Sequence, residues 1–319
     1  MDATTTHEND DDEDDINPVT MILPDDQNDN DAKRFSTVQQ PQQHYVRSID
    51  STVVIRQLPS QGLSFQLWPA ATTLVTLLDH HRCDPSNSPL SSTLLDQRRS
   101  LNILELGSGT GLVGIAAAAT LGANVTVTDL PHVITNLQFN AEANAAVLAA
   151  NGGTVHVAPL RWGEADDVNL IGRDFDLILA SDVVYHDHLY EPLLETLRLL
   201  LLVDCEAQSQ SQTEKKETET VFVMAHLKRW KKDSVFFKKA RKLFHVEVLH
   251  VDRPSQGSRV GIVVYRFARK PQSLNSALAN VSLTWWLIVR TFIFGLNVKE
   301  ISNLEYSENL CFEFKGEEL

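Results

Sequence analysis

The stretch LNILELGSGTGLVG combines one acidic residue with closely spaced glycines in two overlapping patterns. The pattern E-x-G-x-G-x-G is formed by Glu105, Gly107, Gly109 and Gly111, and G-x-G-x-x-G ends at Gly114. Glycines at this spacing let the backbone turn sharply after a strand and approach a ligand at a helix N-terminus. The first pattern is typical of S-adenosylmethionine sites and the second of dinucleotide sites, so the loop alone leaves both open.

Of two carboxylates near this loop, Glu105 favours the methyl donor, whereas Asp129 suits either cofactor. Glu105 ends a predicted strand, where it would repel a pyrophosphate but attract the ammonium of a methionine-type ligand, directly or through water. Asp129 ends the next predicted strand, 18 residues after Gly111, and suits hydrogen bonds from ribose hydroxyls. No second βαβαβ half with a nicotinamide site follows. A purely structural role, in which the glycines only allow helix–strand packing, explains this combination less well.

Strand and helix patterns alternate along the middle of the chain. Strands are expected at residues 45–58, 102–106, 124–130, 154–162, 175–184, 221–226, 245–251 and 260–267. Helices are expected from Pro69 and over residues 109–123, 131–150, 190–202 and 231–244. Such alternation predicts a parallel sheet covered by helices on both faces. RPSQGS is too short for a crossover, so one of the last two strands must run antiparallel. We expect an α/β, Rossmann-like fold whose seven-stranded, mostly parallel sheet ends in an antiparallel hairpin.

Five short stretches carry a family resemblance. LWPAA, ELGSGTGLVGI, TVTDLP, LRWG and LASDVVY resemble the seven-β-strand (class I) protein-lysine methyltransferases of the methyltransferase-like group. The resemblance covers roughly Tyr45 to Arg269 and rests most on LWPAA, LRWG and D-x-x-Y. It implies S-adenosyl-L-methionine as cofactor and transfer of methyl groups to lysines of folded proteins such as chaperones and translation factors.

The resemblance also assigns a set of cofactor-binding positions. They are Trp68, Glu105, Gly107, Ser108, Gly109, Gly111, Asp129, Trp162, Ala180 and Ser181. In this assignment Trp162 stacks near the adenine and Trp68 closes the other side of the pocket. Both tryptophans are also open to a plain core interpretation, because buried aromatic residues are common. Their placement near strand ends favours the site.

The resemblance assigns the reacting end of the site to Asp182 and Tyr185. A free lysine has a pKa of about 10.4, so its amine is protonated at neutral pH and must lose a proton before it attacks. Asp182 is expected to attract the cation and orient the amine, while Tyr185 walls the channel. The alternative is that Asp182 caps the next helix and Tyr185 belongs to the core.

Other features suggest weaker alternatives. His186 and His188 lack a second ligand pair, so no metal site is expected. Eight basic residues lie within residues 228–242 and are compatible with an RNA-binding patch or a solvated helix face. The alternatives to protein-lysine methylation are therefore an RNA or small-molecule methyltransferase and a non-catalytic donor-binding scaffold.

Composition and charge indicate how the chain divides into segments. The chain has 319 residues and a formal net charge of -14, but residues 1–31 carry twelve acids and no Lys or Arg, so the remainder is nearly neutral. We expect a disordered acidic tail over residues 1–43, a methyltransferase domain over 44–270, and an extension of unknown role over 271–319. Arg290 interrupts the apolar stretch at 277–298, so no membrane span is expected.

The remaining expectations concern location and assembly. The three cysteines, Cys83, Cys205 and Cys311, lie far apart and fit a reducing compartment. The tail has no apolar signal-peptide region. We expect a monomer in the cytoplasm or the nucleus, with a protein substrate rather than nucleic acid as partner.

Overall fold

The computed structural model describes residues 41–94, 100–202, 219–253 and 261–271. The predicted acidic tail and C-terminal extension lie almost entirely outside these ranges, and so does the apolar stretch at 277–298. Within the described ranges, no helix combines the length and the apolar character needed to cross a membrane.

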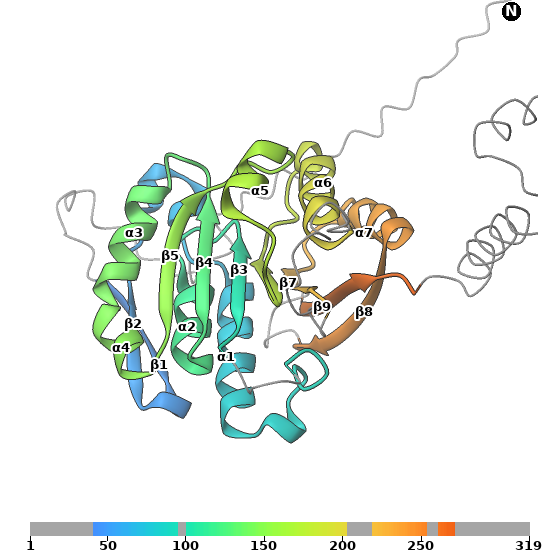
Figure 1. Ribbon diagram of the computed structural model, residues 1–319. Coiled ribbons are helices and arrows are strands. Elements are labelled where there is room, and N and C mark those ends of the chain that lie inside the picture. Colours follow the sequence, from blue (N-terminus) through green and yellow to red (C-terminus); the bar gives the residue numbers. More distant parts are fainter. Residues whose placement is uncertain (1–40, 95–99, 203–218, 254–260, 272–319) are drawn as a thin grey trace, which may run out of the picture. The chain divides into compact units, whose positions relative to one another are not determined.

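A seven-stranded sheet forms the centre of the domain, in the order β5-β4-β3-β6-β7-β9-β8 (Figure 1). The strands are β3 (Asn102–Leu106), β4 (Asn124–Asp129), β5 (Thr154–Pro159), β6 (Leu177–Ser181), β7 (Val221–Leu227), β8 (Phe244–Val251) and β9 (Ile262–Arg269). The first five run parallel, whereas β9 pairs antiparallel with both β7 and β8. The predicted seven strands and terminal antiparallel hairpin are confirmed.

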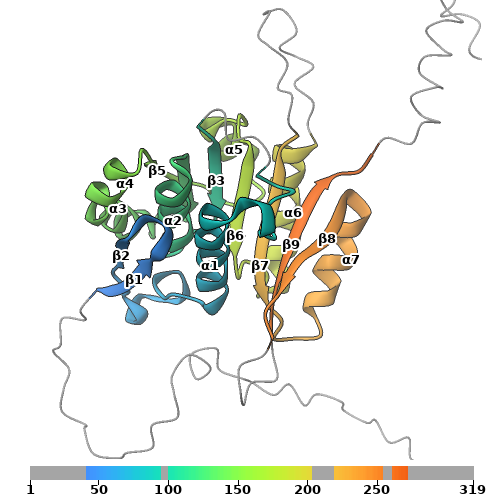
Figure 2. The ribbon, with the colours of Figure 1, turned by 90° about the horizontal axis from the view of Figure 1, so that it is seen from below.

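Helices cover both faces of this sheet (Figure 2). They are α1 (Pro69–Cys83), α2 (Leu112–Leu121), α3 (Ile134–Ala143), α4 (Ala145–Ala150), α5 (Ala165–Ile171), α6 (Tyr190–Leu201) and α7 (Asp233–Leu243). Short 3-10 turns lie at Arg47–Ile49, Pro59–Gln61, Leu63–Phe65, Pro85–Asn87 and Asp187–Leu189. Successive strand residues point to opposite faces, so Ile103 packs with α1 and α2 whereas Leu104 packs with α6 and α7.

A separate hairpin precedes α1. The single strand expected at residues 45–58 is wrong: the chain reverses at Asp50, whose φ is 45°, and forms β1 (Gln42–Val46) and β2 (Ser51–Ile55). Short polar residues such as Asp tolerate this left-handed conformation.

The hairpin is held to α3 by asparagine side chains. Asn144 accepts from the Val54 amide and donates to its carbonyl, both at 2.8 Å. Asn140 makes the same pair of bonds to the backbone of Arg56 at 2.8 and 3.1 Å. Asn144 lies between the two helices, as the C-cap of α3 and the N-cap of α4, so the predicted single helix over residues 131–150 is broken there.

Two further elements differ from expectation. Helix α5 is not among the predicted elements, because its seven residues are too few to show helical periodicity clearly. The predicted helix over residues 231–244 begins only at Asp233, and Phe244 already belongs to β8.

Candidate functional site

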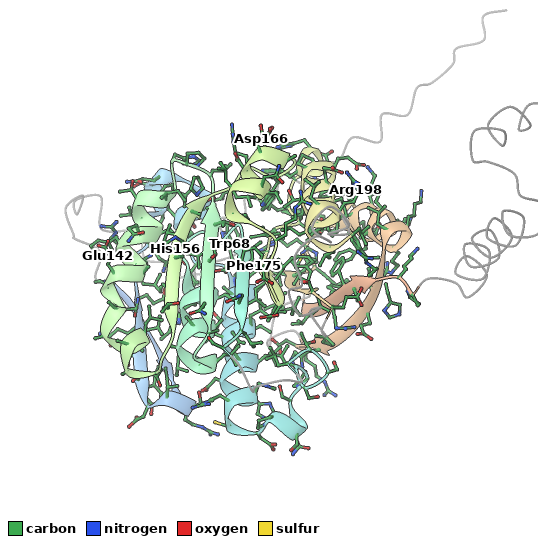
Figure 3. All side chains as sticks on the ribbon, in the orientation of Figure 1. Trp68, Glu142, His156, Asp166, Phe175 and Arg198 are labelled. Atoms are coloured by element: carbon green, nitrogen blue, oxygen red, sulfur yellow. The ribbon has the colours of Figure 1, made fainter. Side chains whose placement is uncertain are left out.

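A cavity of about 250 Å³ lies at the carboxyl edge of the parallel strands. Nine of the twelve predicted site residues line it: Trp68, Gly107, Ser108, Gly109, Asp129, Trp162, Ser181, Asp182 and Tyr185. They come from the last residues of β4 and β6, from the segments after β3, β5 and β6, and from the residue before α1. In this view Trp68 lies over the middle of the domain, whereas Glu142 lies at its periphery (Figure 3). The fold therefore gathers the two predicted halves of the site into one cleft.

The glycine loop forms the floor of one half of this cleft. Gly107 has a φ of 61°, and a Cβ there would lie 2.8 Å from Cζ2 of Trp162. Any side chain would therefore displace the tryptophan, besides adopting a left-handed backbone that favours glycine. Gly109 and Gly111 share this positive φ. The indole thus packs directly on the loop, as a wall for a flat ligand requires.

Asp129 closes the loop from the neighbouring strand. Its Oδ2 accepts from the Gly109 amide and its Oδ1 from the Leu130 amide, both at 2.7 Å. Burial raises the pKa of the Asp129 carboxyl, while these two amides oppose the shift. A carboxylate oxygen has more than one acceptor position, so Asp129 can still accept hydrogen bonds from a ligand.

Glu105 lies beneath the loop rather than on the cavity wall. Its side chain is buried, and Oε2 accepts from the Gly114 amide at 2.9 Å. Among the described residues, Oε1 is buried without a hydrogen-bond partner. Burial raises the pKa of Glu105 to about 8. A cation bound nearby would favour the ionised form of this carboxyl and so lower its pKa.

Two other predicted residues do not line the cavity. Gly111 has a φ of 84° and caps the N-terminus of α2. Ala180 is fully buried in the sheet, where it pairs with Met224 of β7. Their assigned roles as direct donor contacts stay predictions, and their observed positions support the loop and the sheet.

Asp182 occupies a strained position at the acceptor end of the cavity. Its φ is 54°, and its amide donates to the Ala225 carbonyl at 2.9 Å. Its Oδ1 accepts from the Leu227 amide at 2.9 Å. The guanidinium of Arg229 spans both oxygens, with NH1–Oδ1 at 3.3 Å and NH2–Oδ2 at 3.0 Å. The Asp182 carboxylate, which the sequence predicts to be free for a substrate cation, is therefore already paired with the Arg229 cation.

Arg229 and Trp230 also line the cavity, although neither is among the predicted site residues. The sequence pattern places Arg229 in a basic patch, but its side chain is only 4% exposed. The guanidinium lies 5.0 Å from the ring centroid of Trp68 and 5.9 Å from that of Trp230. The strand order could have indicated both residues. They follow β7, which is parallel to its neighbour β6, so they lie at the same edge of the sheet as Asp182.

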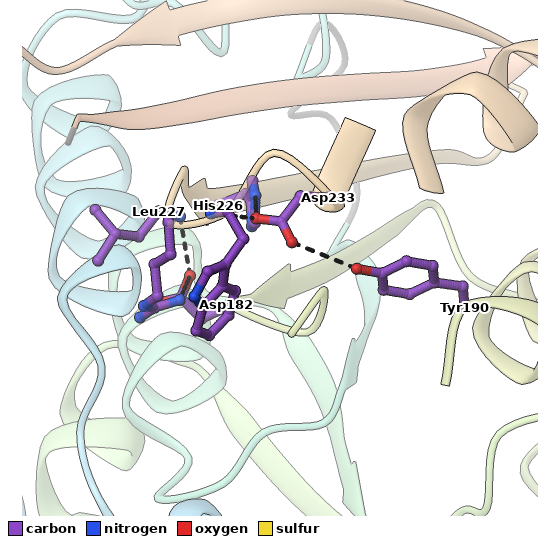
Figure 4. Close-up of polar contacts among 7 residues, drawn as sticks. Asp182, Tyr190, His226, Leu227 and Asp233 are labelled. Atoms are coloured by element: carbon purple, nitrogen blue, oxygen red, sulfur yellow. Dashed lines mark hydrogen bonds and ion pairs between the residues drawn. The ribbon is translucent and has the colours of Figure 1, made fainter. Parts of the chain in front are cut away.

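A second buried carboxylate anchors the same segment from behind (Figure 4). Oδ2 of Asp233 lies 3.2 Å from Nε2 of the fully buried His226. Its oxygens also accept from Tyr190 Oη and from the Trp230 amide, both at 3.4 Å. The contacts of Asp233, together with the hydrogen bond from the Leu227 amide to Asp182, fix residues 227–233 at both ends of the segment.

An aromatic row borders the cavity after β6. The Tyr185 and His186 rings lie 4.8 Å apart, and the His186 and His188 rings stack at 5.3 Å. Burial, and then the charge of Asp129, raises the pKa of Tyr185, so its phenol stays neutral. In the part of the chain that the structure describes, no three His, Cys, Asp or Glu side chains gather as a metal ion would need.

The basic residues of α7 serve a different surface. The apolar face of the helix, with Phe236, Phe237 and Ala240, is buried against the sheet. Arg161 and Arg229 are the only Lys or Arg residues among those lining the described cavity. The α7 lysines therefore lie on the solvated side of a packed helix, outside the cleft.

Comparisons with known proteins agree with this geometry. The model of the lysine methyltransferase family matches residues 48–243. The protein N-lysine methyltransferase METTL21A of Danio rerio is 32% identical over 205 residues, which cover 64% of this chain and 77% of the relative. The protein-lysine N-methyltransferase rrg1 of Schizosaccharomyces pombe is 39% identical over 146 residues, 44% of each chain.

Two further similarities extend the comparison. EEF1A lysine methyltransferase 3 of Mus musculus is 34% identical over 137 residues, 43% of this chain and 50% of the relative. Among solved structures, a predicted O-methyltransferase from Agrobacterium tumefaciens aligns with a TM-score of 0.41 and 18% identity, over 57% of this chain and 80% of that one. The sequence matches, taken with the cleft, show that the chain belongs to the lysine methyltransferase family.

Proposed function

We propose that this protein transfers a methyl group from S-adenosylmethionine to a lysine side chain of a protein substrate. The proposal rests on one observation. A single cleft has Gly107 and Asp129 in one half, where a nucleoside would bind, and Asp182 and Tyr185 in the other half, where the Tyr185 ring forms part of the wall. The family membership and the relatives named as protein-lysine methyltransferases support it. EEF1A, named in one relative, is the first acceptor to test.

The residues present fit the donor. Gly107 lets the Trp162 indole lie directly against the loop, because a Cβ there would be only 2.8 Å from Cζ2 of the indole. Asp129 offers carboxylate oxygens to ribose hydroxyls, and the unsatisfied Oε1 of Glu105 favours a nearby ammonium. When bound, S-adenosylmethionine supplies an electrophilic methyl group to the lysine amine, which loses its proton as S-adenosylhomocysteine is left.

The protein's own work is to bind and align the acceptor. Tyr185 lines the cleft with a neutral ring, whose face can pack against the methylene chain of a lysine and exclude water from the amine. Alignment at about 3 Å from the reacting carbon provides the main acceleration in such displacements. The proton of the amine can leave to solvent through the open end of the cleft.

The direct test is transfer of labelled methyl from S-adenosylmethionine into a dialysed cell lysate and into purified EEF1A. We expect label in one or a few proteins, mapped to lysine. Tyr185→Ala should lower kcat by about 100-fold while the donor Kd changes by less than about threefold, because acceptor alignment is lost. The matched control is Tyr45→Ala, since that tyrosine is 62% exposed and lies on β1.

Other outcomes would replace the proposal. Label in RNA or small molecules would keep the donor site and change the acceptor class. Donor binding without any transfer would favour a scaffold. Full activity of Tyr185→Ala would show that this residue does not align the acceptor.

Asp129→Ala tests the donor half separately. We expect donor affinity to fall by about 10- to 100-fold, because the ribose loses its acceptor and the Gly109 amide loses its partner at 2.7 Å. Calorimetry with S-adenosylhomocysteine measures this effect, and Asp166→Ala, an exposed residue on α5, serves as control. An unchanged Kd would show that the ribose assignment is wrong.

A further inference from the structure

We propose that Arg229 is a positioning residue that sets the charge balance at the acceptor end, so that the substrate lysine binds there as a neutral amine. This inference rests on the proposed function. It gives Asp182 a different task from attracting a lysine cation, because its carboxylate is held by two guanidinium nitrogens at 3.3 and 3.0 Å.

Arg229 joins three segments that line the cleft. It pairs with Asp182 after β6, lies over the ring of Trp68 before α1, and belongs to the segment after β7. The Asp182 and Arg229 side chains are only 2% and 4% exposed, so solvent screens their interaction little. A planar guanidinium can bind both carboxylate oxygens while stacking on an aromatic face, whereas an ammonium lacks this planar two-nitrogen geometry.

The charges facing the cleft show what the pair does. The titratable or charged residues on its wall are Asp129, Arg161, Asp182, Tyr185, His186 and Arg229. Arg161 is paired with Asp167 at 2.8 Å, outside the wall, and Asp129 lies at the donor half on two backbone amides. At the acceptor half, an unpaired Asp182 would stabilise a lysine ammonium and so oppose its deprotonation. With Arg229 in place that carboxylate is balanced, and the positive sulfonium of the donor then favours the neutral amine.

This arrangement predicts opposite pH shifts for the two halves of the pair. Arg229→Gln frees a carboxylate, so the rising limb of kcat against pH should move up by about one pH unit. Asp182→Asn leaves an unbalanced guanidinium, so the same limb should move down by a similar amount. Arg229→Lys keeps the charge, so it should lower kcat but hold the wild-type profile.

The experiment measures kcat from pH 6 to 10 on the protein that the wild type labels in lysate, at saturating acceptor and donor. Arg198→Gln breaks an exposed ion pair with Glu195 and is the matched control, with an unchanged profile expected. Thermal denaturation and S-adenosylhomocysteine binding are recorded for each variant. Arg229 also lies 5.0 Å from the ring centroid of Trp68, an assigned donor residue, so the Arg229 variants are expected to bind the donor more weakly, and saturating donor removes this effect from kcat.

The outcomes separate the alternatives. Opposite shifts support the inference, and the Asp182→Asn and Arg229→Lys arms decide it if Arg229→Gln does not fold. Equal losses with unshifted profiles would reduce the pair to a structural contact and overturn it. A lower KM for the acceptor in Arg229→Gln, with an unshifted pH profile of kcat, would also overturn it. Arg229 would then only occupy the position in which the substrate lysine binds. Absence of transfer by the wild type would overturn the proposed function itself.

Discussion

Asp182→Ala is expected to destabilise the protein by about 3–5 kcal/mol and to abolish methyl transfer. Removing one partner of a buried ion pair has this cost because the other charge stays buried and unpaired. Here the remaining charge is Arg229, whose side chain is 4% exposed. The Leu227 amide loses its acceptor as well.

The backbone adds to the effect. Asp182 has a φ of 54°, a conformation that Asp and Asn adopt several-fold more often than Ala. Asp182→Asn keeps that tolerance and an oxygen for the Leu227 amide but also leaves Arg229 unpaired, so we expect it to fold with a loss near the lower end of the range for Asp182→Ala, about 3 kcal/mol. The difference between the two variants isolates the contribution of the backbone and the hydrogen bond from that of the charge.

Urea denaturation and methyl transfer on the same preparations measure both effects. Asp187→Ala is the matched control, because its side chain lies five positions along the same segment and is 80% exposed. Surface changes of this kind usually fall within about 0.5 kcal/mol. If Asp182→Ala were as stable as the control and still inactive, the residue would act on the substrate directly and not through the Arg229 pair.

Much of the site follows from the sequence by one rule. Residues that end parallel strands meet at one edge of the sheet, and from the strand pattern alone this rule places Gly107, Asp129 and Asp182 together. The same rule extends to the residues after β7 and would add Arg229 to the group. The helical spacing of the basic residues around Arg229 favours a surface patch instead, although the helix begins only at Asp233.

Local patterns cannot show contacts that depend on packing in three dimensions. The bonds of Asn140 and Asn144 to the backbone of Arg56 and Val54 join residues 84 and 90 positions apart, and asparagines in a polar helix look solvated in the sequence. The burial of Glu105 could not be read from its position either. Its place at a strand end predicts a carboxylate facing the ligand, whereas the close approach of α2 places it under Gly114.

Glu105→Gln should stabilise the ligand-free protein at pH 8 and weaken its hold on the donor. Burial raises the pKa of Glu105 from 4.5 to about 8 in the folded protein. Between these values the unfolded chain releases the proton and the folded protein keeps it, so rising pH favours unfolding. Stability contributed by the neutral acid is complete below about pH 4.5 and is lost as pH rises toward 8. The linked change is on the order of 3–5 kcal/mol.

Glutamine is neutral at every pH, so the variant should lack this slope. Its side-chain oxygen can still accept from the Gly114 amide, which the carboxyl does at 2.9 Å. Melting temperatures from pH 5 to 9 should therefore diverge, with the variant higher by about 5–15 °C at pH 8. Glu142→Gln, on the exposed side of α3, should follow the wild type.

Donor binding should move in the opposite direction. A bound ammonium offers Glu105 the partner that its Oε1 lacks among the described residues, so the donor favours the ionised carboxylate and its binding releases a proton. We expect the wild-type Kd for S-adenosylhomocysteine to tighten between pH 6 and 8, and Glu105→Gln to bind about 10-fold more weakly without that dependence. Parallel melting curves for wild type and variant would mean that Glu105 is already ionised in the folded protein. A gain in stability at an unchanged Kd would confine Glu105 to supporting α2.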